Sequence, residues 1–219
     1  MYKVIFLFCL ILILSKIKGQ DIPQSLENRL KLIGMTFTPP KQYTIAHFED
    51  SFGEYACEDE NCPVRKLKVV DAKLTHQDGQ CEILVYVSGA DQVRYGNPQA
   101  KNNPQIKHPQ FFSYNRIKSD FMYGARYKAA SKQDTEDLEM MLNYYPQDSA
   151  KTTFNADYML SYPFNMEGKK CQDKFTCARA IVAGKGGLDI FVYFVFTDKG
   201  MKDFDRYLAE FKQTLWFKE

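Results

Sequence analysis

The chain has 219 residues, 45% hydrophobic and 15% aromatic, with 29 Lys and Arg against 27 Asp and Glu. This length suits one well-buried domain, and the apolar fraction excludes an intrinsically disordered chain. Without the three lysines of an N-terminal leader, 26 basic residues face 27 acidic ones. A net charge near −1 predicts neither a nucleic-acid partner nor attraction to an anionic membrane.

Residues 1–19 have the pattern of a secretory signal peptide. Lys3 precedes an unbroken apolar run at residues 4–14, which is well short of the roughly 20 residues that a spanning helix needs. We predict that the leader is cleaved and that residues 20–219 form one exported domain. Its location is then the periplasm, the cell surface or the extracellular space. An uncleaved anchor is the alternative, and no second apolar segment predicts stable membrane insertion of the mature chain.

Five cysteines follow the leader: Cys57, Cys62, Cys81, Cys171 and Cys177. Export permits disulfides, and the short spacings favour two local bridges, one between Cys57 and Cys62 and one between Cys171 and Cys177. A zinc site built from the same four thiols is the alternative. Zinc usually takes more closely spaced pairs, and a thiolate cluster suits an oxidising compartment poorly. We therefore predict structural disulfides, no metal and no cofactor.

The N-terminal part of the mature chain predicts one helix followed by short strands. The helix covers residues 21–33 and ends at Gly34. Residues 35–40 and 43–49 follow as two strands, the first of which ends in a pair of prolines.

The clearest hairpin lies between residues 66 and 88. Its Asp78-Gly79 dipeptide is typical of a type I′ turn. Counting outward from this turn pairs His76 with Cys81 and Leu74 with Ile83, and one face of the hairpin is then apolar at almost every step. A slip of one residue would scramble that division, which supports the register.

Residues 89–147 predict an insertion. Residues 89–110 are rich in Asn, Gln, Gly and Pro, so we expect a long polar loop, and such loops are usually functional or disordered. Two helices follow, at residues 111–128, where aromatic side chains are dense, and at residues 135–145.

The last third of the chain predicts three strands and a helix. The strands are residues 152–162, 178–183 and 188–197, and the third is apolar on both faces, which predicts a central position in the sheet. The glycine-rich segment 184–187 joins two strands, so it is a hairpin turn and not a phosphate-binding loop, which needs a following helix. Residues 201–215 have the apolar spacing of an amphipathic helix. The expected fold is α+β: a mainly antiparallel sheet covered by N- and C-terminal helices, with a helical insertion.

Some segments carry a resemblance to known proteins. The opening Met35-Thr-Phe-Thr-Pro-Pro, with the closing strand and helix at residues 189–215, resembles the Mog1/PsbP-like group of small α/β sandwich domains. The segments 154–158 and 196–200 look like uncharacterised exported proteins of Bacteroidetes. The resemblance implies a non-catalytic accessory or binding domain of the cell envelope, and no catalytic residues come with it.

The insertion is the best candidate for a binding surface. Aromatic rings beside basic side chains, next to a long polar loop, are typical of surfaces that bind a protein or a glycan. The alternative is that these rings pack the insertion on the sheet. The candidate ligand-binding residues are Tyr114, Tyr123, Tyr127, Arg116 and Arg126.

A second hypothesis is an enzyme of unrecognised type. The cross-strand pair of Cys81 and His76 would bring a thiol beside an imidazole, the raw material of a thiolate nucleophile. The three carboxylates between Cys57 and Cys62 suggest calcium, but their spacing matches no calcium-binding loop. The hydrolase, metalloprotease and dinucleotide-binding motifs are missing from the sequence. We therefore expect a non-catalytic protein, with the Cys81 and His76 pair as the alternative.

Overall fold

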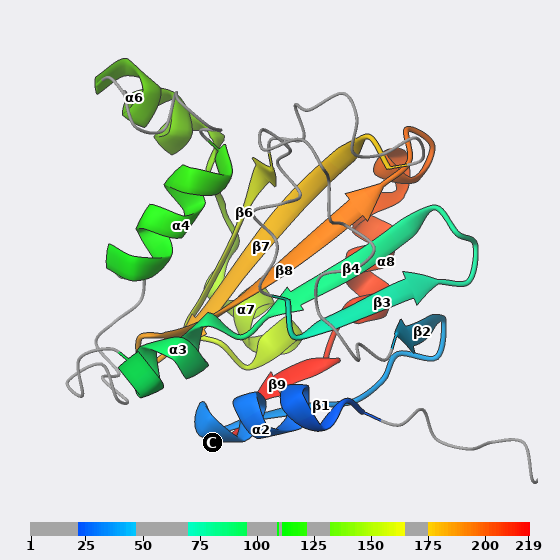
Figure 1. The fold of residues 1–219 in the computed structure, drawn as a ribbon. Coiled ribbons are helices and arrows are strands. Elements are labelled where there is room, and N and C mark those ends of the chain that lie inside the picture. Colours follow the sequence, from blue (N-terminus) through cyan, green and yellow to red (C-terminus); the bar gives the residue numbers. More distant parts are fainter. Residues whose placement is uncertain (1–21, 47–69, 96–108, 110, 122–131, 165–174) are drawn as a thin grey trace, which may run out of the picture.

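The structure is a computed structural model that describes residues 22–46, 70–95, 109, 111–121, 132–164 and 175–219. A seven-stranded antiparallel sheet forms the centre of the fold, in the order β2-β3-β4-β8-β7-β6-β5 (Figure 1). The expected α+β architecture is therefore confirmed. The strands are β2 (Tyr43–Ala46), β3 (Ala72–His76), β4 (Cys81–Tyr86), β5 (Asn143–Tyr144), β6 (Tyr158–Phe164), β7 (Cys177–Lys185) and β8 (Leu188–Phe196).

Helices cover both faces of this sheet. On one face, α2, α7 and α8 contribute apolar side chains such as Leu30, Phe154 and Phe211 to the larger core. On the other face, α4 and α6 contribute Ile117 and Leu138 to a second core. The helices are α2 (Gln24–Leu32), α3 (Ser88–Tyr95), α4 (Phe111–Phe121), α6 (Lys132–Met141), α7 (Gln147–Phe154) and α8 (Phe204–Phe211), which follows the 3-10 turn η3 (Gly200–Asp203).

β8 is the central strand, as its sequence predicts. All nine of its residues are buried, because β4 pairs with one edge of it, β7 with the other, and helices cover both faces. The side chains of Asp189 and Tyr193 point to the face that α4 covers, whereas Phe194 and Phe196 point to the face that α8 covers.

The hairpin of β3 and β4 has the predicted register, but its turn differs from the prediction. Leu74 faces Ile83, as expected. Gly79 has a φ of +66°, whereas Asp78 has no positive φ, which a type I′ turn requires. The carbonyl of His76 accepts a hydrogen bond from the Gly79 amide (2.9 Å), and the Asp78 carboxylate accepts one from the Gln80 amide (2.8 Å). Asp78 therefore stabilises the turn through its side chain.

The glycine-rich segment before β8 is the expected hairpin turn. Gly186 and Gly187 both have positive φ, at 58° and 86°, and Lys185 pairs with Leu188 across the turn. A turn of this kind needs two consecutive residues in the left-handed region, which glycine adopts without steric cost.

Three elements between residues 88 and 154 differ from the expected ones. Helix α3 occupies Ser88–Tyr95, where we expected a polar loop. Residues 143–144 form β5 at the sheet edge, whereas the expected helix continued to residue 145. Helix α7 includes residues 152–154, for which the adjacent threonines had indicated a strand. Pro146 precedes this helix and Asn155, with a φ of +54°, ends it, so the terminal residues outweigh the strand preference of the threonines.

The C-terminal helix is shorter than its apolar spacing predicts. It ends at Phe211, and Gln213 has a φ of +64°, which turns the chain back. Strand β9 (Leu215–Phe217) then pairs antiparallel with β1 (Met35–Phe37), with Met35 opposite Phe217. The two ends of the described chain thus form a separate two-stranded sheet. No helix in the described ranges is long and apolar enough to cross a membrane.

Candidate functional site

Among the described side chains of helix α4, those buried against the sheet are mainly polar. Among its described side chains, the buried ones are Ser113, Ile117 and Asp120, and Ile117 alone is apolar. An amphipathic helix usually presents a continuous apolar stripe to its sheet. Two buried carboxyl groups, Asp120 and Asp189, lie near the two ends of α4.

Asp120 anchors the C-terminal part of α4. Its Oδ2 accepts hydrogen bonds from the hydroxyls of Tyr162 on β6 (2.7 Å) and Tyr193 on β8 (2.8 Å). Its Oδ1 lies 3.1 Å from Nε of Arg116, one helical turn earlier. Burial alone would lower the pKa of Arg116, but Tyr193 and Asp120 raise it above its ordinary value, so the guanidinium stays charged. Asp120 and Arg116 therefore form an ion pair, and two tyrosine hydroxyls donate hydrogen bonds to its carboxylate.

Arg116 also contacts an aromatic ring of the sheet. Its guanidinium carbon lies 5.3 Å from the centroid of the Tyr86 ring, and that of Arg29, from α2, lies 5.9 Å from the same centroid. Tyr86 donates a hydrogen bond to Asp91 of α3 (2.7 Å), and Arg29 pairs with Asp91 (2.8 Å). These contacts tie α2, α3 and α4 to the end of β4.

Asp189 lies under the N-terminal part of α4, at the start of β8. Its side chain is fully buried, and the hydroxyl of Tyr158 donates to Oδ1. Ser113 of α4 and Gln92 of α3 face the same carboxyl, and the Gln92 amide nitrogen lies 3.3 Å from the Ser113 hydroxyl. Burial raises the pKa of Asp189 to about 6, although hydrogen bonding with Ser113, Tyr158 and Gln92 acts to lower it.

The outer side of the insertion exposes apolar side chains. Met140 and Met141 at the end of α6 are 74% and 53% exposed, and Tyr144 on β5 is 55% exposed. Among the large hydrophobic side chains that the structure describes, Leu32 is the other exposed one. We call Met140, Met141 and Tyr144 the insertion patch. Single exposed apolar residues are ordinary, but three within five residues of sequence mark a candidate contact surface.

The candidate ligand-binding residues have different positions. Arg116 is held in the Asp120 ion pair, so it anchors the helix instead of facing solvent. Tyr114 is partly buried, and its hydroxyl donates to Glu139 of α6 (3.4 Å). Tyr123, Tyr127 and Arg126 lie outside the described residues. The sequence pattern missed the exposure of Met141 because helical apolar spacing predicts packing, and β5 ends that helix early.

The contacts of His76 argue against a thiolate–imidazole pair. Its Nδ1 lies 2.8 Å from Oδ1 of Asp78 and its Nε2 lies 3.0 Å from Oε2 of Glu210. Both ring nitrogens therefore face carboxylates, and the Cys81 Sγ lies 3.7 Å from the Glu82 carbonyl oxygen. Burial raises the pKa of the Cys81 thiol above its ordinary value, and the nearby carboxylate of Asp78 raises it further.

We expect Cys81 to resist alkylation in the native protein. Its side chain is fully buried and its raised pKa keeps it a thiol, whereas the thiol of Cys177 at the start of β7 is half-buried. Iodoacetamide labelling at pH 8, followed by peptide mass spectrometry, should modify Cys177 at least about tenfold faster than Cys81. Equal rates in the folded protein would revive the enzyme hypothesis. Labelling in denaturant is the control, because both thiols should then react alike.

The described cysteines do not form the expected bridge. Cys177 carries a free thiol, whose Sγ lies 3.8 Å from Oδ1 of Asp198, so the predicted disulfide with Cys171 is not formed in this structure. Cys57, Cys62 and Cys171 lie outside the described residues, and the bridge between the first two stays a prediction. Within the described ranges, no group of three or more His, Cys, Asp or Glu side chains is placed to hold a metal ion.

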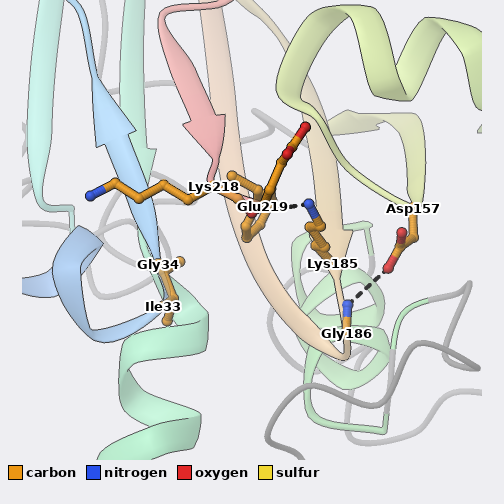
Figure 2. Close-up of a pocket in the computed structure, with 8 residues that line it drawn as sticks. Ile33, Gly34, Asp157, Lys185, Gly186, Lys218 and Glu219 are labelled. Carbon is orange, nitrogen blue, oxygen red and sulfur yellow. Dashed lines mark hydrogen bonds between the residues drawn. The ribbon is translucent and has the colours of Figure 1, made fainter.

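A pocket of about 300 Å³ lies at the end of the sheet, next to the turn between β7 and β8 (Figure 2). Ile33, Phe217 and Gly34 line it together with charged side chains. Two of its polar side chains have partners: Asp157 accepts a hydrogen bond from the Gly186 amide (2.9 Å), and Lys185 donates to the Lys218 carbonyl (3.0 Å). These contacts hold the hairpin turn against the C-terminal strand.

Comparison with known proteins gives little beyond the fold. No family model matches the chain, and no curated protein matches its sequence. The solved structure of cyanobacterial PsbP (CyanoP) from Synechocystis sp. PCC 6803 is similar over 84% of this chain and 87% of that chain, with a TM-score of 0.36 and 8% identity. The expected resemblance to the PsbP-like group thus has a weak counterpart in the fold, which carries no argument about function. The likeness to proteins of Bacteroidetes stays a prediction.

Proposed function

We propose that the protein is an exported, non-catalytic domain of the cell envelope that binds a partner protein through the insertion patch. The observation that carries this proposal is the exposure of Met140, Met141 and Tyr144 beside one another in sequence. Methionine side chains are flexible and polarizable, and they are used at surfaces that bind proteins. The Asp120 contacts support the proposal, because they hold α4 on the sheet and α4 contacts α6, which carries the two methionines.

Export is the other part of the proposal, and it comes from the sequence. The leader at residues 1–19 has a basic start and an apolar run of signal-peptide length. Fractionation of cells that express the full chain would test it: the mature protein should leave the cytoplasm and begin at or near residue 20. Full-length protein retained in the cytoplasm would contradict export and leave the patch proposal standing.

The insertion patch is tested by site-specific photocrosslinking. A benzophenone amino acid at position 141 should give a discrete adduct with one partner in the producing cells, whereas the same probe at the exposed Lys151 of α7 should not. Adding Met140→Ser and Tyr144→Ser should weaken the adduct at position 141 at least about tenfold, which corresponds to 1.4 kcal/mol of binding free energy. Equal adducts at both positions would contradict a specific patch.

The patch substitutions should leave the fold intact. Their side chains are largely exposed, so the free energy of unfolding should change by no more than about 0.5 kcal/mol. Urea unfolding of the Met140→Ser, Tyr144→Ser double variant measures this.

A glycan is the second candidate partner, because Tyr144 and Asn143 are both exposed on β5 and offer an aromatic face beside an amide. Binding of the purified protein to a glycan array, lost on Tyr144→Ser, would favour that ligand over a protein.

A further inference from the structure

Two buried oxygen atoms without hydrogen-bond donors lie at the junction between the sheet and the insertion. Among the described residues, neither Oδ2 of Asp189 nor Oε1 of Gln92 has an aligned hydrogen-bond partner. Gln92 still acts on the Asp189 carboxyl, and its amide nitrogen points to the Ser113 hydroxyl. Without a donor, Oδ2 of an ionised Asp189 carries an uncompensated charge in the core. A proton on Oδ2 would remove that charge.

Among the residues that the structure describes, no cationic side chain contributes to the pKa of Asp189. Tyr158 of β6 is the titratable group in contact with it, and burial and Asp189 raise the pKa of that hydroxyl well above its ordinary value. Three charged groups on the adjoining segments are engaged elsewhere. On α3, Asp91 pairs with Arg29; on α4, Arg116 pairs with Asp120; and before β6, Asp157 accepts from the Gly186 amide.

We propose that Asp189 is a proton-controlled latch, which holds the N-terminal end of α4 and the adjacent α3 on the sheet more tightly when the carboxyl is protonated. In the docked state Oδ2 of the ionised carboxylate is buried without an aligned donor, and a proton on that oxygen removes the uncompensated charge. A second effect of the latch rests on the proposed function. The position of the insertion patch would then also depend on pH. The patch lies on α6 and β5, and α6 contacts α4.

The direction of the pH effect follows because the Asp189 carboxyl binds its proton more tightly when α4 is docked. The pKa of Asp189 is about 6 when α4 is docked, and an exposed Asp titrates near 3.9. Protonation therefore favours docking below pH 6, and this contribution is lost as the pH rises through 6. Between pH 5 and pH 7.5 the docking equilibrium should weaken about tenfold.

Hydrogen exchange measures the latch without any partner. The exchange rates are first corrected for the intrinsic effect of pH and divided by those of β7 amides. On that scale, the amides of residues 111–121 should exchange about tenfold more slowly at pH 5 than at pH 7.5. Asp189→Asn should abolish that ratio, since the amide group can donate at every pH. The matched control is Asp198→Asn, an exposed carboxylate just past the other end of β8, which should keep the ratio. An unchanged tenfold ratio in D189N would overturn the proposal.

A second variant keeps the proposal testable if D189N does not fold. Ser113 acts to lower the pKa of Asp189, so Ser113→Ala should move the midpoint of the exchange change to higher pH. A midpoint that moves down, or stays fixed, would contradict the latch. Crosslinking from position 141 reports separately on the partner. If hydrogen exchange of α4 depends on pH but position 141 gives no crosslinked adduct, the latch is supported and the proposed binding function is contradicted.

Discussion

Replacing Asp120 with Ala is expected to lower the free energy of unfolding by about 3–5 kcal/mol, because it removes one partner of a buried ion pair. The Asp120 side chain is fully enclosed and its partner Arg116 is 20% exposed, so the guanidinium would lose its counter-charge in a poorly solvated position. The hydroxyls of Tyr162 and Tyr193 would also lose their acceptor, and each is fully enclosed by the core.

Urea unfolding monitored by circular dichroism measures this loss. Asp205→Ala is the matched control, because Asp205 is exposed on α8 and its removal should change stability by no more than about 0.5 kcal/mol. Asp120→Asn should lie between the two, since its amide oxygen still accepts from one tyrosine but carries no charge for Arg116. A loss below about 1 kcal/mol for D120A would show that α4 does not depend on this ion pair.

The sequence predicted the sheet better than it predicted the insertion, for a physical reason. Strand β8 is apolar on both faces, and that pattern fits only a central strand, so its place in the order could be inferred. The register of β3 and β4 followed from their alternation around one turn. Strand β9 was not predicted, and its first residue, Leu215, was assigned to the C-terminal helix, because three residues have too little pattern to separate a strand from a helix end.

The sequence could not show which face of α4 meets the sheet, and this face decides where Arg116 lies. Arg116 and Asp120 are spaced as a typical exposed pair on a helix surface. Their tyrosine partners lie 42 and 73 residues further along the chain, and no local pattern connects them. Asp189 was hidden for the same reason, because a single carboxyl in an apolar strand shows no partner until Tyr158, Ser113 and Gln92 are brought to it.

Replacing Gly200 with Ala is expected to destabilise the protein by about 3 kcal/mol, because the added methyl group would meet backbone and not a side chain. A Cβ at this position would lie 2.3 Å from the carbonyl oxygen of Gln80. That carbonyl already accepts a hydrogen bond from the Thr197 amide (3.1 Å), and the Thr197 hydroxyl accepts one from the Gly200 amide (3.1 Å). The methyl group could be accommodated only by separating η3 from the turn before β4.

Gly34→Ala separates this steric effect from backbone strain. Gly34 has a φ of +69°, but a Cβ there would have no atom within 4 Å, so its replacement should cost only the roughly 1 kcal/mol of a left-handed residue. Thermal and urea unfolding should therefore show that G200A is much less stable than G34A. The reverse order would mean that η3 and the Gln80 backbone can move apart at little cost in free energy. Since Phe204 and Tyr207 follow η3 into the larger core, that result would show that α8 can move on the sheet without losing its packing.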